Sequence, residues 1–187
     1  PNGMVLALEP NPYVFKILEK NASLNRDKTN IIPLNFAATD TDGSFEFNYS
    51  DASFCNGGFL QKIENQNHGH KYTLKVQGKN FQQFLQSNYS DKLAALRLVK
   101  VDAEGYDKEI LKSIRPILAQ YKPHIISECN QNLTPAERTE LFELIHGLGY
   151  ELFKLEGFED TDAKTLISSA SMMNQWRHFD LVASPKS

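Results

Sequence analysis

The sequence predicts an α/β fold built around a mostly parallel sheet. Strand patterns alternate with helix patterns along the whole chain. Three acidic residues, Glu9, Asp102 and Glu128, come directly after apolar strand segments. Because ligands bind beyond the carboxyl ends of the strands in such sheets, acids in these positions are placed for chemistry. We therefore expect the functional site along that edge of the sheet.

Composition predicts one soluble domain over residues 1–187. The chain is 41% hydrophobic and 23% charged, enough for one sizeable core. A net charge of −3 gives no general reason to expect nucleic acid or an anionic membrane as a partner. No apolar run approaches the roughly 18–20 residues of a membrane span, and no signal peptide is visible. The two cysteines, Cys55 and Cys129, lack disulfide or metal-ligand spacing, which suits a reducing cytoplasm.

The first elements are a strand and a helix joined at Glu9. An apolar run over residues 4–8 ends there, and the next helix starts with Asn11 as its cap and Pro12 in its first position, ending near residues 25–27. A carboxylate at the tip of the second strand of a nucleotide-binding α/β unit usually accepts hydrogen bonds from ribose hydroxyls. Glu9 is therefore the candidate ribose ligand.

An inserted β-hairpin is predicted next. Residues 31–36 form a strand, and residues 44–49 and 71–77 alternate apolar and polar positions as two antiparallel strands do. The connection over residues 50–70 is too long for a simple turn, so we expect it to border the substrate.

The second half continues with strands over residues 97–101, 124–129, 150–155 and 179–183. A helix over residues 106–118 follows the first of them, and Pro116 is expected to kink or divide it. Capping-box spacing from Thr134 to Glu137 predicts the start of another helix. The turn before the helix over residues 106–118 carries Asp102 and Glu104. An acid there can simply cap a helix, but the second acid at a similar junction, Glu9, favours a chemical role.

Several motifs together resemble the FkbM family of S-adenosylmethionine-dependent methyltransferases. They are Glu9-Pro-Asn-Pro, NASLN at 21–25, Ala37-Ala-Thr-Asp followed by Gly43, Lys100-Val-Asp-Ala-Glu-Gly and Pro123-His-Ile-Ile-Ser-Glu. The resemblance implies a class I methyltransferase fold, a Rossmann-like three-layer sandwich with strand order 3-2-1-4-5-7-6 and an antiparallel last strand. It also implies O-methylation of a hydroxyl on a saccharide, glycolipid or natural product.

The resemblance also implies S-adenosylmethionine as cofactor, bound through Glu9 and Asn11. Ala37 stands where many class I methyltransferases place an acid for the adenine amino group, so backbone groups near Ala37 and Ala38 are expected to read adenine instead. The chain opens on Pro1 and contains no G-x-G-x-x-G. We expect the family's first strand and glycine-rich loop to precede it, so that residues 1–187 start at strand 2 and bind cofactor poorly alone.

An antiparallel last strand would start at the same edge as the acidic tips, bringing Trp176 and His178 there under a loop over residues 156–175. Trp176 would stack on a sugar ring or anchor the core, and His178 would act as a base or lie at the surface. Asp102 is expected closest to the chemistry, accepting the hydroxyl proton or holding the substrate and the cofactor amino group. Glu104 would stabilise the loop or contact substrate, and Glu128 would face the substrate.

Other functions stay open from sequence alone. Asp102 and Glu128 offer the oxygen ligands that Mg²⁺ prefers, but no ligand spacing demands a metal, and we predict none. A non-catalytic binding or scaffold domain is one alternative. A nicotinamide-dependent oxidoreductase would also use Glu9, yet the chain lacks a convincing Tyr-x-x-x-Lys pair. The expected partner is a small-molecule or glycan acceptor, and the oligomeric state does not follow from the sequence.

Overall fold

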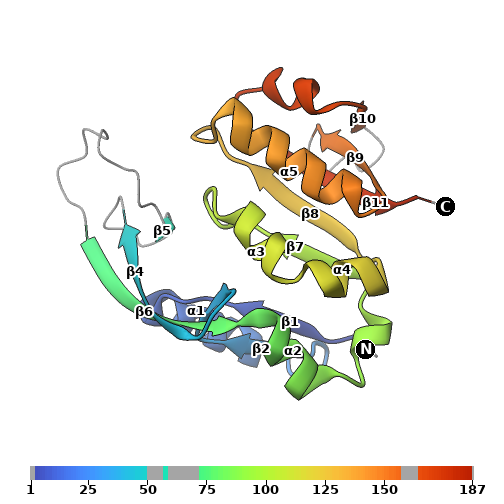
Figure 1. Cartoon of the computed structure of the whole chain (residues 1–187). Coiled ribbons are helices and arrows are strands. Elements are labelled where there is room, and N and C mark those ends of the chain that lie inside the picture. The colour runs from blue at the N-terminus through green and yellow to red at the C-terminus, as the bar shows by residue number, and fades with distance from the viewer. Residues whose placement is uncertain (1–2, 50–56, 59–71, 157–163, 187) are drawn as a thin grey trace. The chain divides into compact units, whose positions relative to one another are not determined.

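The computed structural model describes residues 3–49, 57–58, 72–156 and 164–186. They form two compact units, Pro1–Phe81 and Gln82–Ser187, named here the N-terminal and C-terminal units (Figure 1). Both units combine helices with sheets, so the predicted α/β class is confirmed.

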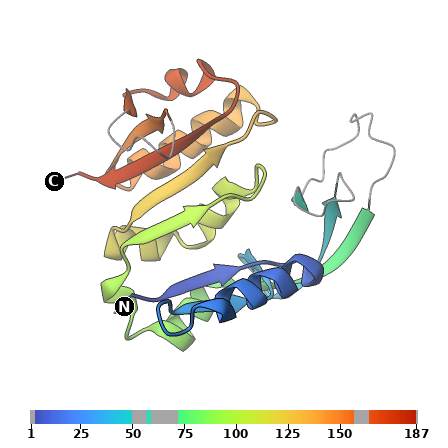
Figure 2. The same ribbon diagram turned by 180° about the vertical axis from the view of Figure 1, so that it is seen from behind.

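The N-terminal unit begins with a β-α-β arrangement. Strand β1 (Val5–Leu8) pairs in parallel with β2 (Ile31–Leu34), and α1 (Pro12–Leu24) connects them. Figure 2 shows α1 lying along this strand pair. Asn11 caps the helix through its side-chain oxygen, which accepts from the Tyr13 amide at 2.9 Å, and Pro12 occupies the first position. Both ends of the predicted helix are confirmed.

A second sheet in the same unit contains the predicted hairpin. Its strands lie in the order β3-β6-β4-β5, with bounds Ala37–Thr39, Tyr72–Asn80, Gly43–Tyr49 and Gly57–Gly58. Strands β4 and β6 pair antiparallel from Gly43 opposite Gly78 to Tyr49 opposite Tyr72. The buried side chains of Ala37, Phe47 and Val76 form its core. The antiparallel hairpin is confirmed; the segment that joins its strands lies mostly outside the described residues.

The predicted strand over residues 31–36 is wrong at its end. Strand β2 stops at Leu34, and Ala37–Thr39 joins the other sheet by pairing in parallel with β6. The reason is Asn35, whose side-chain amide donates to the backbone carbonyls of Glu9 at 2.8 Å and Pro10 at 3.3 Å. These side-chain bonds to the residues after β1 take the place of strand pairing beyond Leu34.

The C-terminal unit is a five-stranded sheet in the order β10-β9-β11-β8-β7. The bounds are Lys164–Ile167, Tyr150–Leu155, Phe179–Pro185, His124–Cys129 and Leu98–Val101. Strands β7 and β8 are parallel, whereas β11 runs antiparallel to both β8 and β9. Figures 1 and 2, viewed from opposite sides, place helices α3 (Asp107–Ser113), α4 (Arg115–Tyr121) and α5 (Pro135–Gly147) on one face of this sheet.

The helices of this unit follow their sequence signals. The predicted helix over residues 106–118 is divided at Ile114 into α3 and α4, and Pro116 is the second residue of α4, where its missing N–H is harmless. Thr134 and Glu137 form both hydrogen bonds of the predicted capping box. Helix α2 (Phe81–Tyr89) and a 3₁₀ turn (Leu93–Ala95) precede β7. Among the described helices, none is long and apolar enough to cross a membrane.

The predicted loop over residues 156–175 is wrong in its second half. Strand β10 pairs antiparallel with β9, and a 3₁₀ helix follows at Ala170–Asn174. Ile167 and Met173 are almost completely buried, so hydrophobic burial draws this segment onto the sheet and α5. Residues 157–163 lie outside the described residues.

Gly78 in β6 tests how tightly the N-terminal unit is packed. A Cβ atom there would lie 2.3 Å from the Phe45 ring and 2.7 Å from Thr39 Oγ1. We expect Gly78→Ala to lower the free energy of unfolding by about 1–3 kcal/mol through overpacking. Gly43→Ala is the matched control, because its Cβ would meet the same ring at an ordinary 3.5 Å. Urea denaturation measures both, and equal midpoints for the two variants would contradict the packing argument.

Candidate active site

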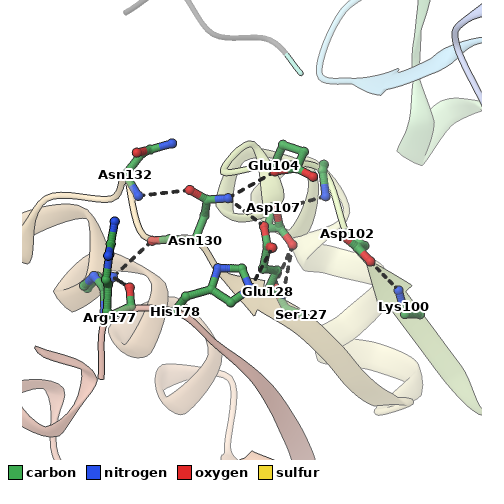
Figure 3. A network of polar contacts seen from close by, with 12 residues as sticks. Lys100, Asp102, Glu104, Asp107, Ser127, Glu128, Asn130, Asn132, Arg177 and His178 are labelled. Atoms are coloured by element: carbon green, nitrogen blue, oxygen red, sulfur yellow. Dashed lines mark hydrogen bonds and ion pairs between the residues drawn. The ribbon is translucent and has the colours of Figure 1, made fainter. Parts of the chain in front are cut away.

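Three chain segments of the C-terminal unit meet at one edge of its sheet. Strands β7 and β8 are parallel neighbours, with Val101 opposite Ser127, so Asp102 and Glu128 follow at the same edge. Strand β11 is antiparallel and starts with Phe179 opposite Cys129, which brings His178 beside the end of β8. Figure 3 shows these side chains together with the turn after β7. The structure thus brings together Glu104, Glu128 and His178, three of the predicted residues.

Glu128 is the centre of this cluster. Its side chain is 9% exposed, and its Oε1 lies 3.3 Å from Nε2 of His178. Its Oε2 accepts a hydrogen bond of 3.0 Å from the side-chain amide of Asn130. Burial raises the pKa of the Glu128 carboxyl; the Asn130 bond opposes this, and the nearby Glu104 and Asp107 charges add to it. The carboxylate is therefore held in place at an electrostatic cost.

Glu104 reaches the same amide from a strained turn. Its φ is +50°, a left-handed conformation that costs a residue with a side chain roughly 1–2 kcal/mol, and Gly105 follows at +101°. Its Oε2 accepts a hydrogen bond of 3.3 Å from the side-chain amide of Asn130. Figure 3 shows the carboxylates of Glu104 and Glu128 both turned toward this amide. One buried amide group thus bridges the two acids.

Asp107 is a buried acid that the sequence interpretation missed. Its oxygens accept hydrogen bonds from the Ala103 amide at 3.2 Å, the Glu128 amide at 3.0 Å and the Ser127 hydroxyl at 3.2 Å. Burial raises the pKa of its carboxyl, and these bonds counteract that effect. Asp107 therefore fastens the turn after β7 to the end of β8. From sequence it looks like any acid in the first turn of a helix.

Asp102 lies at the expected edge of the sheet, and its role in the chemistry stays a prediction. It is about half exposed and forms an ion pair of 2.7 Å with Lys100, which is also about half exposed. Its carboxylate turns toward Lys100 rather than toward Glu128 (Figure 3). Within the described residues, no three His, Cys, Asp or Glu side chains come together in a metal-binding arrangement. The exposed ion pair between Lys100 and Asp102 adds little stability.

Arg138 on α5 holds the edge of the site together, and the sequence interpretation missed it as well. It is only 5% exposed and donates hydrogen bonds to five backbone carbonyls. These belong to Leu133, Asn130, Met173, Trp176 and Arg177, at distances between 2.6 and 3.2 Å. Arg138 shares the helix face of Leu141 and Ile145, a spacing that marks it as buried.

Trp176 has features of both predicted roles, as an anchor in the core and as a stacking surface for a sugar ring. Its ring contacts Phe179 edge-on, with centroids 5.3 Å apart, and the Lys154 ammonium lies 5.5 Å from the ring centroid. The indole is partly buried, so it anchors the start of β11 while keeping some exposed surface. Stacking on a sugar ring remains a prediction.

The predicted cofactor residues lie in the N-terminal unit. Oε1 of the half-buried Glu9 accepts from the Asn11 amide at 2.8 Å, and burial raises the pKa of this carboxyl against that bond. Asn11 is 1% exposed, and its Nδ2 is buried without a hydrogen-bond partner. Among the described residues, Oε2 of Glu9 accepts no hydrogen bond. One acceptor and one donor are therefore available beside the end of β1. Ala37 and Ala38 are buried in β3, opposite Gly78 and Lys79.

Comparison with known proteins places these features in context. Residues 1–152 match the family model described as "Methyltransferase FkbM domain". The hexuronic acid methyltransferase AglP of Haloferax volcanii is 29% identical over 157 residues, which are 83% of this chain and 59% of AglP. The chain thus spans less than two thirds of the length of this relative. No solved structure matches the chain significantly.

Replacing Arg138 should destabilise the C-terminal unit. Arg138→Met leaves five backbone carbonyls without their donor, and we expect the free energy of unfolding to fall by about 3 kcal/mol or more. Arg115→Met on α4 is the control, since that side chain is exposed and its loss should change stability by at most about 0.5 kcal/mol. Urea denaturation, followed by the fluorescence of Trp176, compares the two. Wild-type stability in Arg138→Met would overturn the proposed bracing role.

The raised pKa of Glu128 predicts a pH-dependent stability difference between wild type and Glu128→Gln. Above the ordinary value of 4.5, the native state retains a proton that the unfolded state releases. The native state then binds more protons, so the contribution of Glu128 to stability falls as the pH rises through this interval. Glutamine does not titrate, and wild type should therefore lose stability relative to the variant from about pH 4 upward. Urea unfolding at successive pH values measures the free energy of unfolding of wild type minus that of the variant. A value that stays constant or rises with pH would contradict the predicted sign.

Proposed function

We propose that this chain, which belongs to the FkbM methyltransferase family, transfers a methyl group from S-adenosylmethionine to an oxygen of a saccharide. The family match confirms the resemblance that its motifs carry. The family match over residues 1–152 is the observation that carries this proposal. We further propose that residues 1–187 belong to a single methyltransferase domain.

The strand arrangement supports a class I methyltransferase topology. In the order 3-2-1-4-5-7-6, β1 and β2 correspond to strands 2 and 3, and they pair in parallel. Strands β7, β8, β11 and β9 correspond to strands 4, 5, 7 and 6, and they are neighbours in that sequence. The antiparallel β11 corresponds to the antiparallel last strand of that fold.

The residues near β1 fit the ribose of the cofactor. Oε2 of Glu9 is an acceptor for a ribose hydroxyl, and the buried Nδ2 of Asn11 is a donor that lacks a partner within the described chain. Backbone groups near Ala37 and Ala38 are proposed to read adenine. When bound, S-adenosylmethionine supplies a methyl group on a cationic sulfonium that an oxygen attacks in line.

The cluster at the end of β8 suits the acceptor side of this reaction. An alcohol is a weak nucleophile until its proton is being removed, and Asp102 and His178 are the proposed bases. Glu104 and Glu128 are proposed to bind the acceptor, with Trp176 stacking on a sugar face. AglP is named for methylation of a hexuronic acid, which supports a saccharide acceptor here.

Glu9→Gln should weaken cofactor binding. A hydrogen bond to a charged carboxylate is worth about 1.5–3 kcal/mol, so we expect about 10- to 100-fold weaker binding of S-adenosylmethionine to the full-length protein. Glu19→Gln on α1 is the control, because it removes an exposed carboxylate from the neighbouring helix. Isothermal titration calorimetry measures both constants. Equal affinities for the two variants would exclude Glu9 as a ribose ligand.

The activity itself is tested with an isotope-labelled methyl donor. The full-length protein is incubated with hexuronic acid and neutral hexose glycosides, and products are analysed by mass spectrometry. We expect a labelled methyl group on one of these saccharides and no tight binding of NAD by calorimetry. Tight NAD binding without methyl transfer would instead indicate an oxidoreductase, and binding of neither cofactor would indicate a scaffold domain.

A further inference from the structure

We infer that Glu128 and His178 act as a pair, in which Nδ1 of His178 accepts the proton of the acceptor hydroxyl and Glu128 positions the ring. This inference rests on the proposed methyl transfer and selects His178 over Asp102 as the base. His178 would touch the reacting atoms, whereas Glu128 acts through it as a positioning residue.

The geometry determines which imidazole nitrogen is available. Oε1 of Glu128 lies 3.3 Å from Nε2 of His178. An ionised carboxylate can only accept hydrogen bonds, so we assign the hydrogen of the neutral ring to Nε2, the nitrogen nearest the carboxylate, and the lone pair to Nδ1. Among the described residues, Nδ1 has no hydrogen-bond partner. The nitrogen that faces away from Glu128 is therefore the basic one.

Exposure separates the two members of the pair. The His178 side chain is 49% exposed, whereas that of Glu128 is 9% exposed. A buried carboxylate behind a half-exposed imidazole orients the ring while leaving its other side open to a substrate. Asp102 lacks such an arrangement, because its carboxylate forms an ion pair with the adjacent Lys100 ammonium and, in the described part of the chain, has no imidazole beside it.

Hydrogen bonds from Asn130 and Arg138 hold Glu128 and His178 in position. Asn130 donates to Oε2 of Glu128, and its own Oδ1 accepts from the Asn132 amide at 2.9 Å. Arg138 donates to the carbonyls of Asn130 and Arg177, which lie next to the segments that carry Glu128 and His178. The same guanidinium therefore ties both halves of the pair together.

The charged groups around the pair are mostly acidic. Glu104 and Asp107 lie on the turn after β7 and on α3, and both raise the pKa of Glu128. Asp180 on β11 is paired in register with Glu128, and Arg177 precedes His178 in the chain.

The proposed step conserves atoms and charge. The hydroxyl oxygen forms a bond to the methyl carbon while the carbon–sulfur bond breaks, and its electron pair goes to sulfur. The hydroxyl proton moves to Nδ1 of His178, and the resulting imidazolium is stabilised by Glu128. The proton then leaves to solvent, which restores the neutral ring.

The first test removes the base in the full-length protein. We expect His178→Ala to lower kcat by about 10²- to 10⁴-fold, with little change in S-adenosylmethionine affinity, and added imidazole to restore part of the rate. His124→Gln is the control, because His124 is an exposed histidine at the opposite end of β8 and should retain the wild-type rate. Wild-type kcat in His178→Ala would overturn the inference, and so would failure of imidazole to restore any rate.

The second test changes the positioning residue alone. In Glu128→Gln, Asn130 still needs an acceptor, so the glutamine oxygen faces Asn130 and its NH₂ faces His178, which favours the wrong tautomer. We expect kcat to fall by about 10²-fold or more while the KM for the saccharide changes little. A kcat identical to wild type, or a loss seen only in KM, would exclude Glu128 from this role.

The outcomes separate this inference from the proposed function. If the wild-type protein binds no S-adenosylmethionine and methylates no saccharide, the proposed function fails. If it methylates a saccharide and His178→Ala does so equally well, only the base assignment fails. Cofactor binding by each variant, measured by calorimetry, shows that its fold is intact.

Discussion

The architecture of the candidate site depends on the burial of the Arg138 guanidinium. A buried charge without partners would cost several kcal/mol, but this one is surrounded by five backbone carbonyls. Those carbonyls come from the turn after β8 and from the segment before β11. One side chain on α5 therefore determines where the two segments that carry the polar cluster lie relative to each other.

The cluster that these segments support is unfavourable for stability by itself. Burial raises the pKa of both Glu128 and Asp107, which means that keeping either group ionised costs free energy. Glu104 adds a left-handed backbone conformation in the same turn. Perturbed carboxyl groups and backbone strain gather more often at functional sites than elsewhere. Their concentration at the end of β8 is consistent with a site retained for chemistry.

Sequence patterns predicted most of the elements but only part of this site. The edge at which Asp102, Glu128 and His178 lie followed from strand order, since parallel neighbours end together and an antiparallel strand begins where they end. Arg138 and Asp107 were missed because a charged residue on a helix is usually solvated. The helical spacing of Arg138 with Leu141 and Ile145 was the one local signal of its burial.

The sequence by itself determined the family, the helix caps, the division of the helix just before Pro116 and the strand tips that carry acids. These features depend on residues close together in the chain, where spacing and backbone chemistry leave few alternatives. Tertiary structure alone decided that Asn130 bridges the carboxylates of Glu104 and Glu128 and that Arg138 donates to the carbonyls of Met173 and Arg177. The contacts from Asn130 to Glu104 and from Arg138 to these carbonyls join distant segments, and their burial depends on the packing of the whole unit, which no local pattern encodes.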